Sequence, residues 1–415
     1  MSSPSRRLGR SNFAALHTHN AALYFATQTL SMVGTFVQMF AQAWLVLTIS
    51  GDTAALPLSI ALQTLPLLVL GTWGGALADR LDNRRLLLAT TAANAVLALT
   101  LGVLVARGGV DVGVVYLFGI LGGLVTVVER PATQAFLAEI VAPEQITSAV
   151  GINSMIFPFA RLAGPPLAGL SIAAFGLAGC FIVNAMSFVV FFIGMLALRR
   201  ADLYERRRTP QRKKMISAGL RYARRDRTVG HSLVVMFFVG LAGFNFMAAI
   251  PMMGKYTFHL TESGLVIPMA AGAVGSLLAG ALGAGFAHPT LRTQAICVVT
   301  FGAILLMSGL APTTTMWTVA SVAVGFTAVL FTTITGQLLQ QASAPEMLGR
   351  VMALNSIAFL GTTPFGMVMV AWLASTYTAR APFTVGGAAV LVTGLVSAAT
   401  IARHRTPEPA GISAG

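Results

Sequence analysis

Three charged side chains lie inside long apolar segments of the sequence: Glu129, Arg130 and Arg161. A charge near the centre of a bilayer-spanning helix costs about 2.5–3.5 kcal/mol on the most lenient insertion scale, so each should face protein or water. Counted outward from Pro143, Glu129 is 14 residues away and Arg161 is 18. At about 1.5 Å per residue their depths differ by about 6 Å, which two long side chains can bridge.

This spacing favours a protonatable pair, in which protonation of Glu129 frees Arg161 and shifts a conformational balance. Two alternatives stay open, because structural ion pairs occupy similar places. The pair could be static, or Glu129 could pair with the adjacent Arg130. Outside the predicted span over 112–140, which contains Glu129, every acidic residue maps to a loop or terminus. Glu129 is therefore the best-placed carboxylate for carrying a proton, ahead of Glu139 and Asp79.

A polar stripe runs along the first apolar segment at steps of 3, 4, 3 and 4 residues, formed by Gln28, Ser31, Thr35, Gln38 and Gln42. On a helix this spacing makes one row about 21 Å long. Such a row cannot face lipid, so it faces either a central cavity or another helix through hydrogen bonds. We expect the cavity.

The segment "MFFVGLAGFNFMAAIPMM" adds Phe244, Asn245 and several methionines as further cavity candidates. Aromatic faces and flexible thioethers suit varied lipophilic ligands. The alternative for any one of these side chains is that it faces lipid.

The elements that position these residues are membrane-spanning helices. Of the 415 residues 56% are hydrophobic and only 10% are charged, whereas soluble domains carry about 25% charged residues. Apolar runs long enough to cross a bilayer recur throughout, and the first is too long for a signal peptide. The fold class is therefore an all-α membrane protein with twelve predicted spans, at about 20–49, 56–78, 85–106, 112–140, 146–175, 177–198, 229–250, 264–286, 292–311, 315–341, 349–376 and 382–402.

Charge sets the predicted orientation. Most of the 27 Lys and Arg residues fall in alternate loops and at the termini, and twelve of them lie between 199 and 227. The positive-inside rule then places both termini in the cytoplasm. The net charge of +14 reflects this topology rather than binding to nucleic acid.

The chain divides into two predicted halves. The predicted spans divide the chain into four parts. These are a six-helix half over 1–198, a basic cytoplasmic linker over 199–228, a second six-helix half over 229–402 and a cytoplasmic tail over 403–415. "APEQITSAVGINS" (142–154) and "APEMLGRVMALNS" (344–356) repeat at an offset of 202 residues. A half-length repeat is typical of transporters, whose substrate site lies at mid-membrane between the halves.

The loop "GALADRLDNRR" (75–85) resembles the signature loop of the major facilitator superfamily, G-x-L-A-D-R-x-G-R-[KR]. Asp82 replaces the usual glycine and Asn83 the usual basic residue. The resemblance implies a charge network at a cytoplasmic gate, with Asp79 facing the start of span 11 near Arg350. An ordinary positive-inside loop is the alternative, but it would not require two carboxylates. The gate residues are Gly75, Leu77, Asp79, Arg80, Arg84 and Arg350.

"ARLAGPPLAG" (160–169) resembles the antiporter motif of exporters in that superfamily through Gly164, Pro165 and Gly169. Simple packing of small residues between helices is the alternative. This antiporter-like segment, together with "ERPATQAFLAEIVAPE" and "ISAGLRYARRDRTV", makes the chain similar to the enterobactin-exporter-like and drug-efflux branch of the superfamily. The usual drug-exporter arginine early in span 4 has no obvious counterpart.

The resemblance implies a secondary transporter of the bacterial inner membrane that exports an amphipathic or lipophilic molecule, drug-like or siderophore-like, by proton antiport and alternating access. The expected partners are that substrate, protons and membrane lipid, with the chain acting as a monomer. Neither an enzyme signature nor a phosphate-binding GxxxxGK[ST] occurs, and no metal or other cofactor is expected. The alternatives are a proton-coupled nutrient importer, or a non-transporting sensor or scaffold whose basic linker binds a partner or anionic lipid.

Overall fold

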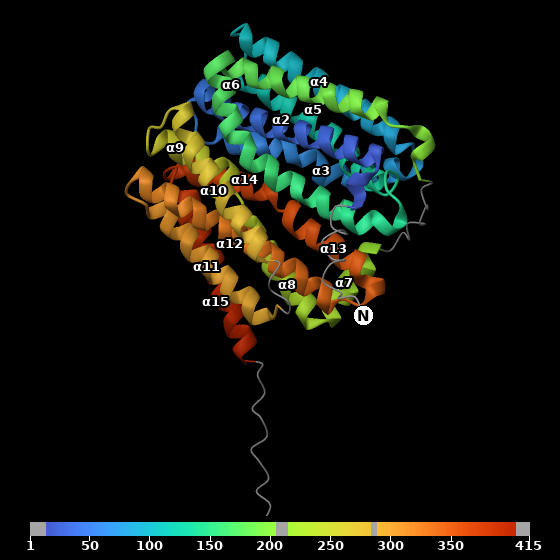
Figure 1. Ribbon diagram of the computed structural model, residues 1–415. Helices are drawn as coiled ribbons and strands as arrows, with labels where there is room; N and C mark the ends of the chain where they lie inside the picture. The colour runs from blue at the N-terminus through green and yellow to red at the C-terminus, as the bar shows by residue number, and fades with distance from the viewer. Residues whose placement is uncertain (1–13, 205–214, 284–288, 404–415) are drawn as a thin grey trace, which may run out of the picture. The chain divides into compact units, whose positions relative to one another are not determined.

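Helices form the framework of the computed structural model, which describes residues 14–204, 215–283 and 289–403 (Figure 1). In a bilayer the backbone N–H and C=O groups have no water to bind, so long apolar segments fold as helices that satisfy their own backbone. The helices are α2 (His19–Ser50), α3 (Ala55–Arg80), α4 (Asn83–Ala106), α5 (Val112–Leu137), α6 (Ile146–Ala197), α7 (Met215–Arg225), α8 (Arg227–Gly243), α9 (Phe246–Tyr256), α10 (Glu262–Gly283), α11 (Leu291–Leu310), α12 (Thr314–Ala342), α13 (Pro345–Leu360), α14 (Thr363–Thr376) and α15 (Ala381–Arg403).

The described helices account for twelve membrane crossings. Ten candidate spans are long and apolar enough, and the bent pair Ala55–Gly71 and Trp73–Arg80 makes an eleventh. One of the ten, Ser148–Ala197, has 50 residues, or about 75 Å, against a hydrocarbon core about 30 Å thick. It kinks at Gly176, where φ is 68°, a left-handed conformation that glycine adopts readily. Since α6 therefore crosses twice, the predicted twelve-helix fold class is confirmed.

Besides the bent pair, which covers the span predicted over 56–78, two predicted spans are broken. The span predicted over 229–250 consists of α8 and α9, separated at Phe244 and Asn245, and it continues to Tyr256. The span predicted over 349–376 consists of α13 and α14. The first break lies between apolar flanks, so hydropathy could not reveal it, whereas the second falls at Gly361–Pro364, where glycine and proline mark a break. The predicted linker contains the helix α7, while its residues 205–214 lie outside the described ranges.

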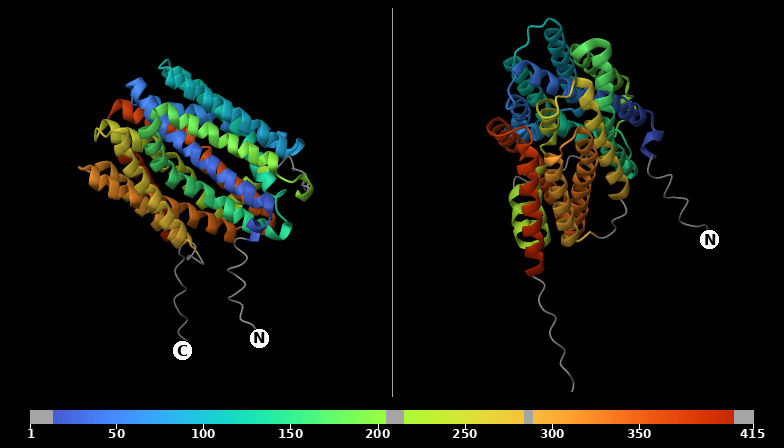
Figure 2. Two further views of the ribbon diagram at one scale, coloured as in Figure 1. Left: turned by 45° about the horizontal axis from the view of Figure 1, so that its top comes forward. Right: turned by 90° about the vertical axis from the view of Figure 1, so that its left-hand side faces the viewer.

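The chain forms two compact units. The first comprises Met1–Gln211, Ile250–Ala273 and Met367–Ala379, and the second comprises Arg212–Ala249, Val274–Gly366 and Arg380–Gly415. In the first unit α2 packs along α6 and lies between its two stretches (Figure 2), while α3 packs beside α5. In the second unit α11 packs against α12 and α15. The division into six-helix halves at 199–228 stays a prediction.

Within the first unit, the end of α9 attaches to the end of α2 through Lys255. Its Nζ donates a hydrogen bond to the carbonyl oxygen of Leu47 at 2.5 Å. The same ammonium lies 5.6 Å from the ring centroids of both Trp44 and Tyr256. The last carbonyls of a helix have no partner within it, and a cation stabilises them. Lys255 therefore caps α2.

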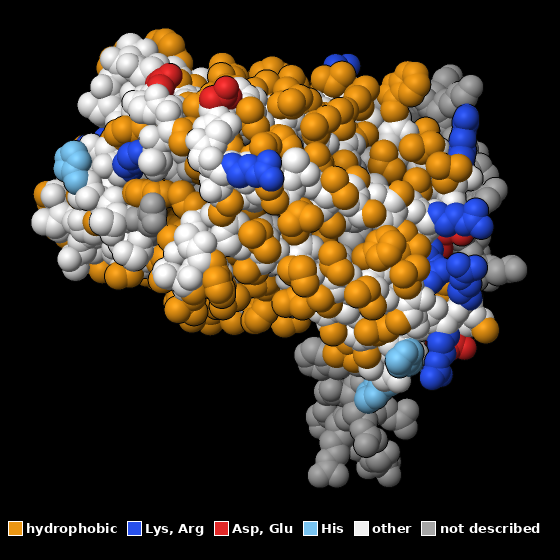
Figure 3. Space-filling model, turned by 90° about the horizontal axis from the view of Figure 1, so that it is seen from above, with side chains coloured by type: hydrophobic (Ala, Val, Ile, Leu, Met, Phe, Trp, Pro, Cys, Tyr) orange, Lys and Arg blue, Asp and Glu red, His pale blue; other side chains and the backbone are white. Residues whose placement is uncertain are grey.

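Large apolar side chains are exposed along many helices, including Leu170, Phe175 and Met307. Hydrophobic side chains cover most of the face seen in Figure 3, and Lys and Arg gather along one edge of it. An apolar surface of this extent would be a liability in water. It matches the hydrocarbon core of a bilayer.

Candidate functional site

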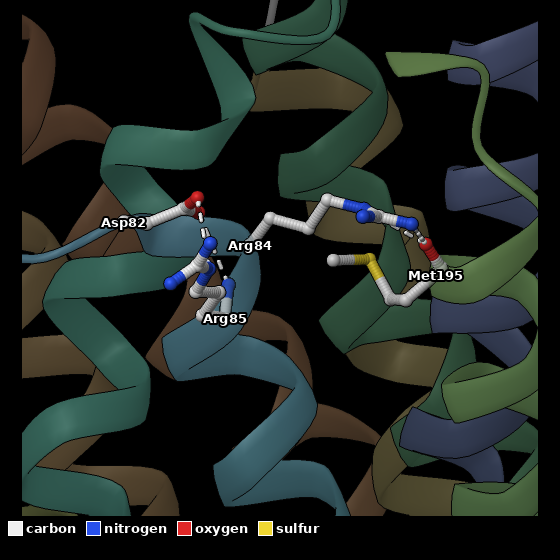
Figure 4. A network of polar contacts seen from close by, with 4 residues as sticks. All are labelled: Asp82, Arg84, Arg85 and Met195. Carbon is white, nitrogen blue, oxygen red and sulfur yellow. Dashed lines mark hydrogen bonds and ion pairs between the residues drawn. The ribbon is translucent and has the colours of Figure 1, made fainter.

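Arg84, one of the predicted gate residues, caps the end of α6. The side chain is only 6% exposed, and its Nη2 donates to the carbonyl oxygens of Met195 at 2.8 Å and Leu196 at 3.1 Å. Its Nε also donates to Met195 at 3.1 Å (Figure 4). The planar guanidinium reaches two carbonyls that the helix cannot satisfy. Arg84 therefore fixes α4 to the end of α6.

The two departures from the superfamily loop each have a local role. Asp82 is the N-cap of α4, because its Oδ1 accepts a hydrogen bond from the Arg85 backbone N–H at 3.1 Å. Its ion pair with the Arg85 side chain spans 3.7 Å between side chains 54% and 84% exposed, so it contributes little. Asn83 Nδ2 donates to Glu139 Oε1 at 2.6 Å and ties α4 to the segment that follows α5.

The other predicted gate residues are placed as follows. Asp79 is partly buried, whereas Leu77 and Arg80 are exposed on the second limb of α3, and a Cβ on Gly75 would meet nothing within 4 Å. Arg350 lies on α13 of the second unit, where its Nη1 is 3.2 Å from the sulfur of Met347. The network joining Asp79 to Arg350 stays a prediction.

Glu129 has a partner that sequence reasoning missed. Asn94 Nδ2, on α4, donates to Glu129 Oε2 at 2.9 Å. Arg130 is exposed and Arg161, on α6, is partly buried, so the pairing of Glu129 with Arg161 stays a prediction. The sequence did contain a signal for this partner. Asn94 is an amide in the middle of the apolar segment 83–106, where a polar side chain needs a hydrogen-bond partner.

The antiporter-like segment lets α6 approach its neighbours closely. A Cβ on Gly164 would lie 2.4 Å from the Cβ of Phe36 on α2, and a Cβ on Gly169 would lie 2.9 Å from Val266 on α10. Pro165 continues the helix between them. Both glycines thus have a packing role, and their role in the direction of transport stays a prediction.

Replacing Gly164 by Ala should destabilise the first unit by about 1–3 kcal/mol, because the added methyl group meets a side-chain atom fixed close to the backbone. Gly122, on α5, is the matched control, since a Cβ there would meet nothing within 4 Å. Gly122→Ala should be neutral or slightly stabilising. Thermal unfolding in detergent measures both, and equal midpoints would contradict the assigned contact.

The polar stripe of α2 is present, but its members differ in environment. Gln28 and Ser31 are buried, while Thr35, Gln38 and Gln42 are partly buried. Thr35 Oγ1 donates to the Ser31 carbonyl oxygen at 3.0 Å, and Gln38 Oε1 accepts from Asn184 Nδ2 of α6 at 2.7 Å. Gln38 thus makes the interhelical bond expected under the alternative interpretation.

Cysteines introduced at Thr35 and Gln42 should react with a small aqueous thiol reagent and be protected by substrate, in a background lacking Cys180 and Cys297. Both native cysteines are buried and form no disulfide. A cysteine at Val37, which is 1% exposed, should stay unreactive and serves as the control. Equal inertness of all three positions would mean that the stripe does not line a water-filled path.

An aromatic cluster surrounds the break between α8 and α9. The ring of Phe244 has its centroid 4.8 Å from Phe359, 5.6 Å from Phe301, 5.8 Å from Phe246 and 6.4 Å from Phe331. Asn245 is 4% exposed, and its Nδ2 donates to the Leu241 carbonyl oxygen at 2.7 Å. The two predicted cavity residues of this span therefore lie where α11, α12 and α13 supply further aromatic rings.

Relatives of known sequence are transporters. The chain is 28% identical over 174 residues to a staphyloferrin A transporter of Staphylococcus aureus, a match that covers 42% of this chain and 43% of that protein. The chain thus spans less than half the length of this relative. It is 21% identical over 378 residues to macrolide efflux protein A of Streptococcus pyogenes, covering 90% and 93% of the two chains. The multidrug efflux pump Tap of Mycolicibacterium fortuitum is 24% identical, with 90% and 94% covered.

Solved structures show the same fold. A bacterial homologue of the human lysosomal transporter Spinster superposes with a TM-score of 0.71 at 15% identity, covering 98% of this chain and 100% of that one. A bacterial homologue of the iron transporter ferroportin gives a TM-score of 0.71 at 16% identity, with 91% and 97% covered.

The family model described as "Transmembrane secretion effector" matches residues 10–409, which is nearly the whole chain. The helices it covers are the crossings described above. A further relative, the uncharacterized MFS-type transporter YfiS of Bacillus subtilis, is 28% identical over 209 residues, which covers 48% of each chain. The chain therefore belongs to the transmembrane secretion effector family of the major facilitator superfamily.

Proposed function

We propose that the protein exports an amphipathic or lipophilic small molecule from the bacterial cytoplasm in exchange for protons. The efflux relatives support the direction of transport. The observation that carries the coupling is Glu129, a partly buried carboxylate held by Asn94 within an apolar helix. An ionisable side chain at such a place is expensive to keep and marks an ion or proton path.

We expect substrate contacts from the α2 stripe in the first unit and from the aromatic cluster around Phe244 in the second unit, each considered by itself. Phenylalanine faces provide apolar contact and bind cations through their ring electrons. Amides such as Gln42 and Asn245 add a few polar contacts, as in other small-molecule sites. This mixture suits bulky lipophilic compounds better than a small charged nutrient, for which few cavity charges are available.

In this proposal the six-helix halves 1–198 and 229–402 rock about the site, with the linker 199–228, both termini and the gate of Asp79 and Arg350 in the cytoplasm. The protein acts as a monomer in the inner membrane. Broken helices near a substrate site are common in transporters, because their freed backbone groups can bind ligands. The break at Phe244 and Asn245 fits that role.

Uptake into inside-out membrane vesicles tests the function. Vesicles acidified inside should accumulate erythromycin, staphyloferrin A or tetraphenylphosphonium when they contain the protein. Collapse of the pH gradient should release the compound. Proton-driven movement of amino acids or sugars out of the vesicles would favour the nutrient importer. Absence of any transport would favour a sensor or scaffold.

A further inference from the structure

Three arginines of α7, namely Arg221, Arg224 and Arg225, lie on one face of that helix. Their spacing of three residues and one residue places them within about 100° of the helix circumference. All three are exposed, and Leu220, which is 45% exposed, lies one turn before Arg224 in the same row. Among the side chains that the structure describes, no carboxylate forms an ion pair with these arginines. We call these four residues the arginine face of α7.

The opposite face of α7 packs against α13 and the connection that precedes it (Figure 1). A Cβ on Gly219 would lie 3.3 Å from the Cβ of Arg350. The Tyr222 hydroxyl donates to the Ala342 carbonyl oxygen at 3.4 Å and accepts from the Ala344 backbone N–H at 3.2 Å. These contacts fix the rotation of α7 about its axis, so the arginine face is held outward.

The arginine face lies at the end of a membrane span. α7 ends at Arg225, and the apolar span that contains α8 begins two residues later at Arg227. Asp226, between them, is the N-cap of α8, because its Oδ1 accepts from the Val229 backbone N–H at 2.9 Å. The polar layer of a bilayer is about 5–8 Å thick on each side of the hydrocarbon core. A helix this close to the start of a span therefore lies at the level of the lipid headgroups.

A basic face in water is the simpler interpretation, because the positive-inside rule already predicts basic loops. That rule concerns the number of charges, however, and requires neither one shared face nor an exposed leucine within it. Guanidinium groups bind phosphate in a bidentate manner. Their aliphatic stems and Leu220 can lie against the apolar boundary beneath the headgroups. The combination matches a phospholipid better than it matches water.

We propose that the arginine face of α7 binds anionic phospholipid headgroups of the surrounding bilayer. Because Gly219 and Tyr222 fix α7 to α13 and its preceding connection, bound lipid anchors the start of α13 at the membrane surface. That helix carries Arg350. Binding of lipid at this surface depends neither on the direction of transport nor on Glu129.

Fluorescence quenching in reconstituted membranes tests the inference. A small apolar fluorophore is attached to Leu220→Cys in a background lacking Cys180 and Cys297. The bilayer is phosphatidylcholine with a small fraction of spin-labelled phosphatidylglycerol or spin-labelled phosphatidylcholine. Each arginine near an anionic surface contributes about a fivefold preference. Half-quenching should therefore need at least about fivefold less of the spin-labelled phosphatidylglycerol than of the spin-labelled phosphatidylcholine.

Changing all three arginines of the face to Gln should abolish this preference for phosphatidylglycerol. The side chains are exposed, so thermal unfolding should be close to that of the wild type. Arg224→Gln alone should weaken the preference severalfold, and it gives the result if the triple variant does not fold. Equal quenching by the two lipids in the wild type would overturn the proposal.

The matched control changes Arg85, Arg199 and Arg200 to Gln, which removes three exposed arginines from the first unit. This variant should keep the preference, and an equal loss would show that general surface charge, rather than the arginine face, attracts the lipid. Sodium phosphate and sodium chloride of equal ionic strength should weaken the preference equally, since both act by screening. A stronger effect of phosphate would reassign the face to a soluble phosphate ligand and overturn the lipid assignment.

Discussion

We expect Glu129→Gln to abolish stimulation of transport by a pH gradient and to leave substrate binding intact. A gradient of about one pH unit supplies about 1.4 kcal/mol per proton, enough for about a tenfold accumulation of substrate per proton exchanged. Glutamine keeps the size of the side chain and can still accept from Asn94, but it cannot carry a proton. Accumulation in inside-out vesicles should therefore fall to the equilibrium level, while binding of a labelled compound to purified protein is retained.

Glu139→Gln is the matched control for this prediction. Glu139 accepts a hydrogen bond from Asn83 through Oε1, and an amide oxygen can still accept that bond. Accumulation should persist in Glu139→Gln. The opposite pattern, with coupling lost in Glu139→Gln and kept in Glu129→Gln, would move the proton carrier to the segment that follows α5.

Asp79→Asn should strongly reduce the transport rate without impairing folding or membrane insertion. In the proposed gate the carboxylate is stabilised by Arg350 and by the start of α13, and a hydrogen bond to a charged group contributes about 1.5–3 kcal/mol. Its loss should shift the gating equilibrium about ten- to a hundredfold. Initial rates of uptake, normalised to the amount of protein in the membrane, measure this effect.

Asp82→Asn separates the gate from the general charge of the loop. Asn caps a helix as well as Asp does, and the ion pair of Asp82 is exposed. This variant should transport at the wild-type rate. If Asp79→Asn also does so, the assignment of Asp79 to a gate is wrong.

The number of spans could be predicted from sequence because each span must be apolar over about 20 residues and must satisfy its own backbone. The kink in α6 could also be placed from sequence, since Gly176 falls between the spans predicted over 146–175 and 177–198. The break within the span over 229–250 could not be predicted. Phe244 and Asn245 are flanked by apolar residues on both sides, so hydropathy is continuous where the helix is not.

The candidate site residues stay predictions, and the contacts of Glu129 could not be predicted from sequence. The cost of a charge in lipid singled out Glu129, but its depth gave no indication that Asn94 donates to it. That contact depends on how α4 and α5 are rotated against each other, which packing decides. The same holds for Arg84, whose partners are backbone carbonyls about 110 residues away and carry no signal in the sequence.

Substrate-driven proton movement is the most direct test of proton-coupled export. Purified protein in liposomes that enclose a pH-sensitive dye, with erythromycin, staphyloferrin A or tetraphenylphosphonium added outside, reports proton flow in real time. We predict that at least one compound drives protons in the opposite direction to its own movement, and that Glu129→Gln removes this signal. Movement of the compound with no accompanying proton flow, in wild type and Glu129→Gln alike, would contradict the account.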